Sequence, residues 1–97
     1  MASNTYREIR EDLRCIADIL EDNDFEYKAY NTGIQFNVKD TDGIIHSFYP
    51  TSGTMLFHAS NERSDRRIKT IRGGSIEEFM QMLRHTKRIK NLFTEGD

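Results

Sequence analysis

Histidine, cysteine and acidic residues are the side chains that most often carry catalysis or bind metals, and this sequence spaces them poorly for either task. The three histidines, His46, His58 and His85, form no i, i+4 pair and have no acidic or cysteine neighbour at zinc-site spacing. The single cysteine, Cys15, has no evident activating base. No Ser–His–Asp order and no carboxylate pair stands out. We therefore predict a protein that is not an enzyme and that uses no metal or cofactor, with His46 as a core histidine.

The stretch Asp40-Thr41-Asp42-Gly43 has the composition with which a calcium loop begins. Counted from Asp40, the twelfth position of such a loop needs an acidic ligand, and Thr51 occupies it. Gly43 instead suits the left-handed position of a three-residue hairpin loop. A hairpin turn is therefore the preferred interpretation of this stretch.

A basic arm that ends in two glycines is the candidate for binding an anion or a nucleic acid. It leads into Ser75, where we expect a helix to begin, and free amides at such a helix end favour a phosphate or a carboxylate. An ordinary capped helix behind a solvated loop is the preferred alternative. The G-x-x-x-x-G-K-[ST] pattern of nucleotide hydrolysis is missing. The arm consists of Arg66, Arg67, Lys69, Arg72, Gly73 and Gly74.

Two helices are expected, one at each end of the chain. In the first, Thr5 and Glu8 form a capping-box pair, and apolar residues then recur at helical spacing, which predicts a helix over 5–22. The second begins with the capping-box pair Ser75 and Glu78 and continues over 75–93.

Between the helices the apolar period changes to two, which predicts four β-strands from residue 25 to residue 58. Turn-forming residues separate them at 31–33, 41–43 and 50–53. These loop lengths pair Val38 with His46 and Phe48 with Met55. We interpret 60–74 as an exposed connection, and a short strand at 67–71 remains open.

One face of this meander gathers large side chains and is predicted to be the core. Its members are Phe25, Tyr27, Ala29, Ile34, Phe36, Val38, Ile44, His46, Phe48, Met55 and Phe57. The predicted fold is α+β: helix, four-stranded antiparallel meander, helix, in two layers with both helices on one sheet face. We expect a single α-β-β-β-β-α domain over 1–97, frayed at 1–4 and 94–97.

The opposite sheet face is then left uncovered. A solvated face is common in antiparallel sheets, but this one is more apolar than solvation requires, and tyrosine is a favoured anchor at interfaces. RNA-binding sheets also stack bases on aromatic residues, yet Lys28 and Lys39 are the only cations here. The predicted partner-binding residues are Tyr30, Ile45, Tyr49, Leu56 and His58.

Composition limits the remaining function classes. The chain has 97 residues with a net charge of −2, and no apolar run is long enough to span a membrane. The N-terminus lacks the features of an export signal, and the lone cysteine fits a reducing compartment, so we expect a cytoplasmic protein. Acidic residues concentrate in 1–26 and basic residues in 60–90, and a bipolar chain of this kind suits a charged partner.

Two stretches, HSFYPTSGTMLFH at 46–58 and RGGSIEEFMQML at 72–83, resemble small accessory proteins of bacteriophages and prophages. Those proteins share an aromatic-Pro-Thr-x-Gly-Thr/Lys hairpin and an Arg/Gly-rich start to the last helix. The matching residues are Tyr49, Pro50, Thr51, Gly53 and Thr54, then Arg72, Gly73 and Gly74. The resemblance implies a phage or mobile-element protein in the host cytoplasm, where such proteins bind and block a host or defence component.

Two hypotheses follow. The first is a protein-binding factor, an inhibitor of a host or defence protein, that uses the uncovered sheet face. The second is a nucleic-acid-binding module that uses the basic arm with Lys87 and Arg88 of the last helix, and the sequence pI of about 5.9 counts against it. A homodimer through the uncovered face is open under the first hypothesis.

Overall fold

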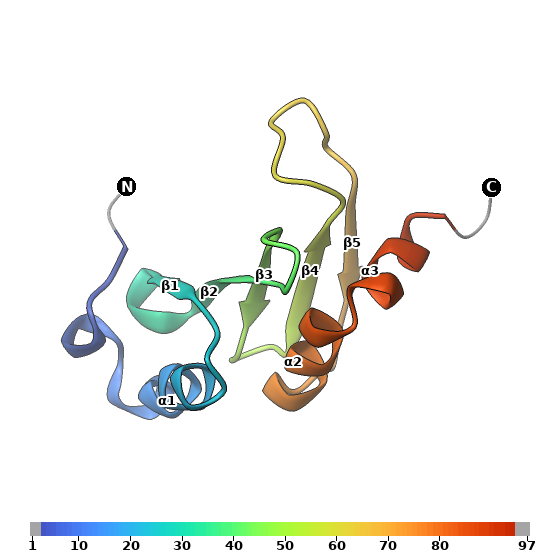
Figure 1. The fold of residues 1–97 in the computed structure, drawn as a ribbon. Coiled ribbons are helices and arrows are strands. Elements are labelled where there is room, and N and C mark those ends of the chain that lie inside the picture. Colours follow the sequence, from blue (N-terminus) through green and yellow to red (C-terminus); the bar gives the residue numbers. More distant parts are fainter. Residues whose placement is uncertain (1–2, 95–97) are drawn as a thin grey trace.

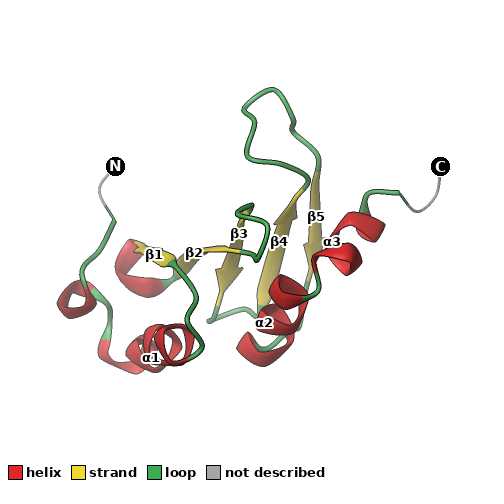
Figure 2. Cartoon of the chain, viewed as in Figure 1, coloured by secondary structure: helices red, strands yellow, loops and turns green. Residues whose placement is uncertain are grey.

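The chain folds into an antiparallel sheet with helices packed against it (Figure 1). The computed structural model describes residues 3–94. The elements, in chain order, are α1 (Arg14–Asp22), β1 (Tyr27–Tyr30), β2 (Gln35–Lys39), β3 (Ile45–Tyr49), β4 (Thr54–His58), β5 (Ile68–Ile71), α2 (Ile76–Arg84) and α3 (Thr86–Leu92). Figure 2 shows the same elements by type. The α+β class predicted from the sequence is confirmed.

The sheet has five strands in the order β1-β2-β3-β4-β5, so the prediction of four was wrong. The fifth strand pairs with β4 through Met55–Ile71 and His58–Ile68. Its four residues, IKTI, are too short to show a clear alternation next to the irregular basic loop that precedes them. The predicted pairings of Val38 with His46 and of Phe48 with Met55 are confirmed.

The predicted helix over 5–22 is shorter than expected. Residues 6–8 and 11–13 form 3-10 turns, and the α-helix begins at Arg14. The capping box of Thr5 and Glu8 is present, but Ile9 has an extended backbone (φ −75°, ψ 134°). A tertiary contact explains the break, because the Arg10 N–H donates to the Thr32 carbonyl at 2.8 Å and ties this segment to the β1–β2 turn.

The predicted helix over 75–93 is broken at His85, where φ is −119° and ψ is 67°. The Thr41 N–H and hydroxyl both donate to the Leu83 carbonyl, at 3.2 and 3.3 Å. The β2–β3 turn therefore takes up a carbonyl at the end of α2 that would otherwise lack a partner. The chain then continues as the separate helix α3.

The core lies between one sheet face and the helices. Phe79 of α2 is fully buried and lies against Phe48 and Phe57, with ring centroids 5.2 and 5.8 Å apart. Leu20 of α1 belongs to the same buried cluster. Ile34, predicted to be core, is 37% exposed instead, because the left-handed turn at 31–33 places it ahead of the first residue of β2.

The N-terminal segment adds one contact to the sheet. The Asn4 N–H donates to the Ala29 carbonyl at 2.7 Å, so this residue, placed by the sequence in a frayed end, pairs with β1. Residues 1–2 and 95–97, also expected to fray, lie outside the described part of the chain. Among residues 3–94, no helix has the length and apolar character that crossing a membrane requires.

Candidate binding surface

The uncovered face is the sheet surface opposite the core. Strand register places its members in rows, because directly paired residues share a face. One row runs from Lys28 to Thr70 and consists of Lys28, Asn37, Ser47, Leu56 and Thr70. The pairs Tyr30–Gln35, Tyr49–Thr54, Lys39–Ile45 and His58–Ile68 complete the face. All five partner-binding residues predicted from the sequence are on it.

Exposed isoleucines occupy this face on both sides of His58. Ile45 on β3 is 39% exposed and Ile68 on β5 is 49% exposed. Leu56 and Tyr49 are half-buried on the neighbouring strands. Ile68 was absent from the predicted face, because the sequence left a short strand at 67–71 open without pairing it to the sheet. The alternation of Ile68 and Thr70 with Lys69 and Ile71 was the available signal.

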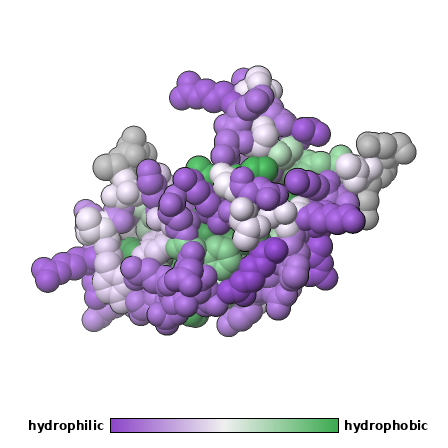
Figure 3. All heavy atoms as spheres, viewed as in Figure 1, coloured by the Kyte–Doolittle hydropathy of each residue, from purple (hydrophilic) through white to green (hydrophobic). Residues whose placement is uncertain are grey.

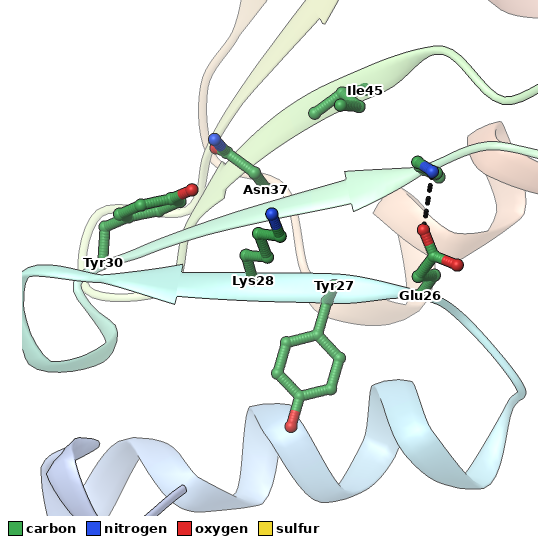
Figure 4. Close-up of a pocket in the computed structure, with 7 residues that line it drawn as sticks. Glu26, Tyr27, Lys28, Tyr30, Asn37 and Ile45 are labelled. Carbon is green, nitrogen blue, oxygen red and sulfur yellow. Dashed lines mark ion pairs between the residues drawn. The ribbon is translucent and has the colours of Figure 1, made fainter. Parts of the chain in front are cut away.

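A hollow of about 350 Å³ lies at the β1–β2 end of the uncovered face. Figure 4 shows Lys28, Tyr30, Asn37 and Ile45 on one side of the strands, while Tyr27 points the other way, toward α1. The Lys39 ammonium lies 2.7 Å from the Glu26 carboxylate at the rim, and this contact lowers the pKa of Glu26. The hollow thus combines an apolar wall with hydrogen-bonding groups, as protein interfaces do.

Asn37 is held in one orientation at the floor of this hollow. Its Oδ1 accepts hydrogen bonds from Gln35 Nε2 at 2.9 Å and from Ser47 Oγ at 2.8 Å. Two donors on the oxygen fix which end of the amide is the NH₂ group. Within residues 3–94 that NH₂ group has no acceptor, so it can donate to a partner.

A buried hydrogen-bond network lies on the core side of the sheet, directly behind the uncovered face, and links β3 to β4. His46 is fully buried; its Nε2 is 2.8 Å from Asp40 Oδ2 and its Nδ1 accepts from the His58 N–H at 3.0 Å. Because Nδ1 is an acceptor, the proton of the neutral ring is on Nε2. Burial lowers the pKa of His46, and the nearby Asp40 opposes that shift without reversing it. This is a core histidine, as predicted, without access to any substrate.

The basic arm does not converge on one site. Arg67 pairs with Asp65 at 2.8 Å and lies 5.9 Å from the centroid of the Phe93 ring. Pairing with β4 places Lys69 on the core side of the sheet, whereas Ile68 and Thr70 belong to the uncovered side. Arg66 and Arg72 lie in the connections before and after β5.

Gly74 of the arm packs closely against Gly53 and Met55. The Gly74 N–H donates to the Gly53 carbonyl at 2.8 Å, so that amide is already used. A side chain on Gly53 or Gly74 would collide with neighbouring atoms, and Gly73 has a left-handed φ of 77°. The first turn of α2 carries Glu77 and Glu78, which already complement the positive end of the helix dipole.

Across residues 3–94 no three His, Cys, Asp or Glu side chains gather in a way that would hold a metal ion. Burial lowers the pKa of His58, and within residues 3–94 no hydroxyl or thiol hydrogen-bonds to its ring. Comparison with protein-family models, with curated proteins and with solved structures finds no match for this chain.

Proposed function

We propose that this protein is a non-enzymatic binding domain whose uncovered face docks onto a partner protein. The observation that carries the proposal is the exposure of Ile45 and Ile68 on a sheet face that also presents Tyr30, Tyr49 and Leu56. Exposed apolar side chains grouped on one rigid surface and bordered by polar ones are typical of interaction sites. Backbone pairing holds the face in place before the partner arrives, which lowers the entropic cost of binding.

A protein fits this face better than a nucleic acid does. Of its two cations, Lys39 is paired with Glu26, which leaves Lys28 as the one lysine of the face without an ion pair among residues 3–94. Phosphate backbones require many cations, because counterion release supplies most of the affinity. The basic arm does not supply them on this side, since Lys69 is on the core side and Arg67 is paired with Asp65.

The resemblance of 46–58 and 72–83 to phage accessory proteins supports a bacterial host or defence protein as the partner. In that setting the domain acts in the host cytoplasm and blocks its target by occupying a surface. A second copy of the chain on the same face is the competing outcome of the test below.

The test compares capture by two matched double variants. Tyr30→Ala with Ile45→Ala removes two members of the uncovered face, whereas Tyr6→Ala with Ile34→Ala removes the same residue types from exposed positions outside its strands. Each variant is immobilised and incubated with lysate of the bacterium that carries the gene, after circular dichroism has confirmed folding. We expect the first variant to lose the partner retained by the wild type and by the second.

Equal capture by both double variants would contradict the proposal. Light scattering on the free protein distinguishes the competing outcome. A dimer that dissociates only in the Tyr30/Ile45 variant would assign the face to self-association.

A further inference from the structure

The N-terminal segment hydrogen-bonds to the β1 edge of the sheet, whereas no described strand covers the β5 edge. At β1, the Asn4 N–H donates to the Ala29 carbonyl at 2.7 Å, and Asn4 Oδ1 accepts from the Thr32 N–H at 2.8 Å. At β5, no further strand of residues 3–94 follows. An uncovered edge strand is a template for pairing with another chain.

The hydrogen bond from the Ala59 N–H to the Arg67 carbonyl, at 3.2 Å, shows which groups of β5 face β4. Because pairing alternates along an antiparallel strand, Lys69 and Ile71 also bond to β4, while the N–H and C=O groups of Ile68 and Thr70 point outward. Within residues 3–94 these outward groups have no hydrogen-bond partner. The edge therefore presents two donors and two acceptors at the spacing that an added strand needs.

A groove of about 590 Å³ lies on the core side of this edge, between β5, α2 and α3. Figure 1 shows α3 beside β5. Its lining is mainly apolar and consists of Met55, Ile71, Met82 and Leu92, with Glu78, Gln81 and Arg88 as the polar residues. In Figure 3, which views this side, hydrophobic spheres show between hydrophilic ones over the middle of the sheet and toward the C-terminal end. Alternate side chains of an added strand would point toward this groove, as in strand-addition complexes.

Charge indicates what kind of strand fits. Arg66, Lys69 and Arg72 surround the edge, are exposed, and form no ion pair within the described chain. Arg88 adds a cation at the groove, whereas the carboxylate of Glu78 is engaged by the Ser75 hydroxyl at 3.3 Å. Acidic side chains on an incoming strand would meet opposite charge here.

The same cations disfavour a second copy at this edge. Edge-to-edge pairing of two β5 strands would bring Lys69 and Arg72 of one chain toward the same residues of the other. Like charges across paired strands are destabilising, and charged residues at an edge are a common protection against such pairing. Pairing of two β5 edges is therefore disfavoured, whereas pairing of β5 with an acidic segment is favoured.

We propose that the β5 edge binds an extended acidic segment of a partner protein, which joins the sheet as a sixth strand. The segment turns its apolar side chains toward the groove and its acidic side chains toward the opposite side of the sheet, where Arg66 and Arg72 lie at the two ends of β5. Its main chain pairs with Ile68 and Thr70. This site uses the main chain of Ile68 and Thr70, whose side chains belong to the uncovered face, together with the groove on the other side of the sheet. It does not depend on the function proposed for that face.

The probe is a blocked eight-residue peptide of alternating valine and glutamate, added to ¹⁵N-labelled full-length protein. We expect amide exchange at Ile68 and Thr70 to slow by about tenfold or more, since free edge amides exchange readily and paired ones are protected. Lys69 and Ile71 already bond to β4 and should change little. The matched valine–lysine peptide should leave all four amides unchanged.

Two variants separate strand addition from simple charge attraction. Thr70→Pro removes one outward N–H and no ladder bond, since proline is tolerated where an edge N–H faces solvent, so it should abolish peptide binding in a folded protein. Arg72→Glu should weaken binding about tenfold or more through like-charge repulsion. Lys28→Glu, on the uncovered face, is the matched control and should bind as the wild type does.

Four results would overturn the proposal. They are unchanged exchange at Ile68 and Thr70 at millimolar peptide, full binding by Thr70→Pro, equal protection of these amides by a DNA oligonucleotide, and a wild-type dimer that the peptide does not dissociate. The Tyr30/Ile45 double variant should still bind the peptide. Failure at β5 therefore leaves the function of the uncovered face undecided, and the reverse holds as well.

Discussion

The two faces of the sheet are made by the same strands and differ in what lies over them. On the core side, Phe36, His46 and Phe57 are fully buried, and both ring nitrogens of His46 have partners. On the uncovered side, Ile45 and Ile68 are exposed. The difference shows that strand periodicity assigns residues to faces, while the helices decide which face carries stability and which is left for binding.

The largest expected effect is a difference in unfolding free energy between a variant of the core face and a variant of the uncovered face. Phe57→Ala should cost about 3–5 kcal/mol of unfolding free energy, because it leaves a cavity beside Phe79. Ile68→Ala, on the exposed side, should cost only about 0.5 kcal/mol. Urea unfolding of both variants measures the contrast, and similar losses would show that the uncovered face is also part of the core.

The next effect concerns the buried network behind the uncovered face. Asp40 Oδ1 accepts from the Asp42 and Ile44 N–H groups at 2.8 and 3.0 Å, and Oδ2 accepts from His46. Asp40→Asn places an NH₂ group opposite the Nε2–H of His46, so two donors face each other. If the proton of His46 moves to Nδ1 instead, that N–H faces the His58 N–H, which is also a donor. Either tautomer leaves one buried N–H without an acceptor, which should lower the unfolding free energy by about 1–3 kcal/mol.

Asp42→Asn is the matched control for that variant. Asp42 lies 3.3 Å from Lys90 in an exposed ion pair, so its loss should change the unfolding free energy little. Thermal unfolding at pH 7 compares the two variants. An Asp40→Asn protein as stable as Asp42→Asn would mean that the network contributes nothing.

A smaller effect is the pH dependence of stability. Burial lowers the pKa of both His46 and His58 below the usual value of 6.5. The unfolded chain therefore binds more protons than the folded one once the pH falls below about 6.5, and the unfolding free energy should decline from there toward the lowered folded pKa values. His58→Gln should make this decline shallower, and denaturation between pH 7.5 and 5 measures it. A flat profile would contradict the assignment of a neutral buried imidazole.

Much of the fold was predictable because period and turn residues are local signals. Alternating residues from 25 to 58 and the glycines at 33, 43 and 53 predicted the first four strands and their pairings. The breaks at Ile9 and His85 were not predictable, since each depends on a hydrogen bond to a distant turn, Arg10 with Thr32 and Thr41 with Leu83. The apolar residues keep their helical spacing through both breaks, so the sequence pattern gives no sign of them.

The membership of the candidate face was predictable, and its geometry was not. Register alone puts Tyr30, Ile45 and Leu56 on one side. The hollow beside Ile45 and the fixed amide of Asn37 depend on side-chain packing, which no periodicity encodes. Ile68 escaped prediction because its strand is four residues long and adjoins an irregular loop.

Site-specific photocrosslinking in bacterial cells, the setting that the proposed function implies, tests the claim for the uncovered face most directly. A photoreactive amino acid replaces Ile45, and in a second protein it replaces Glu77, which is exposed on α2. The account predicts one discrete adduct of higher mass from position 45 and none from position 77. No adduct from position 45, or the same adducts from both positions, would contradict it.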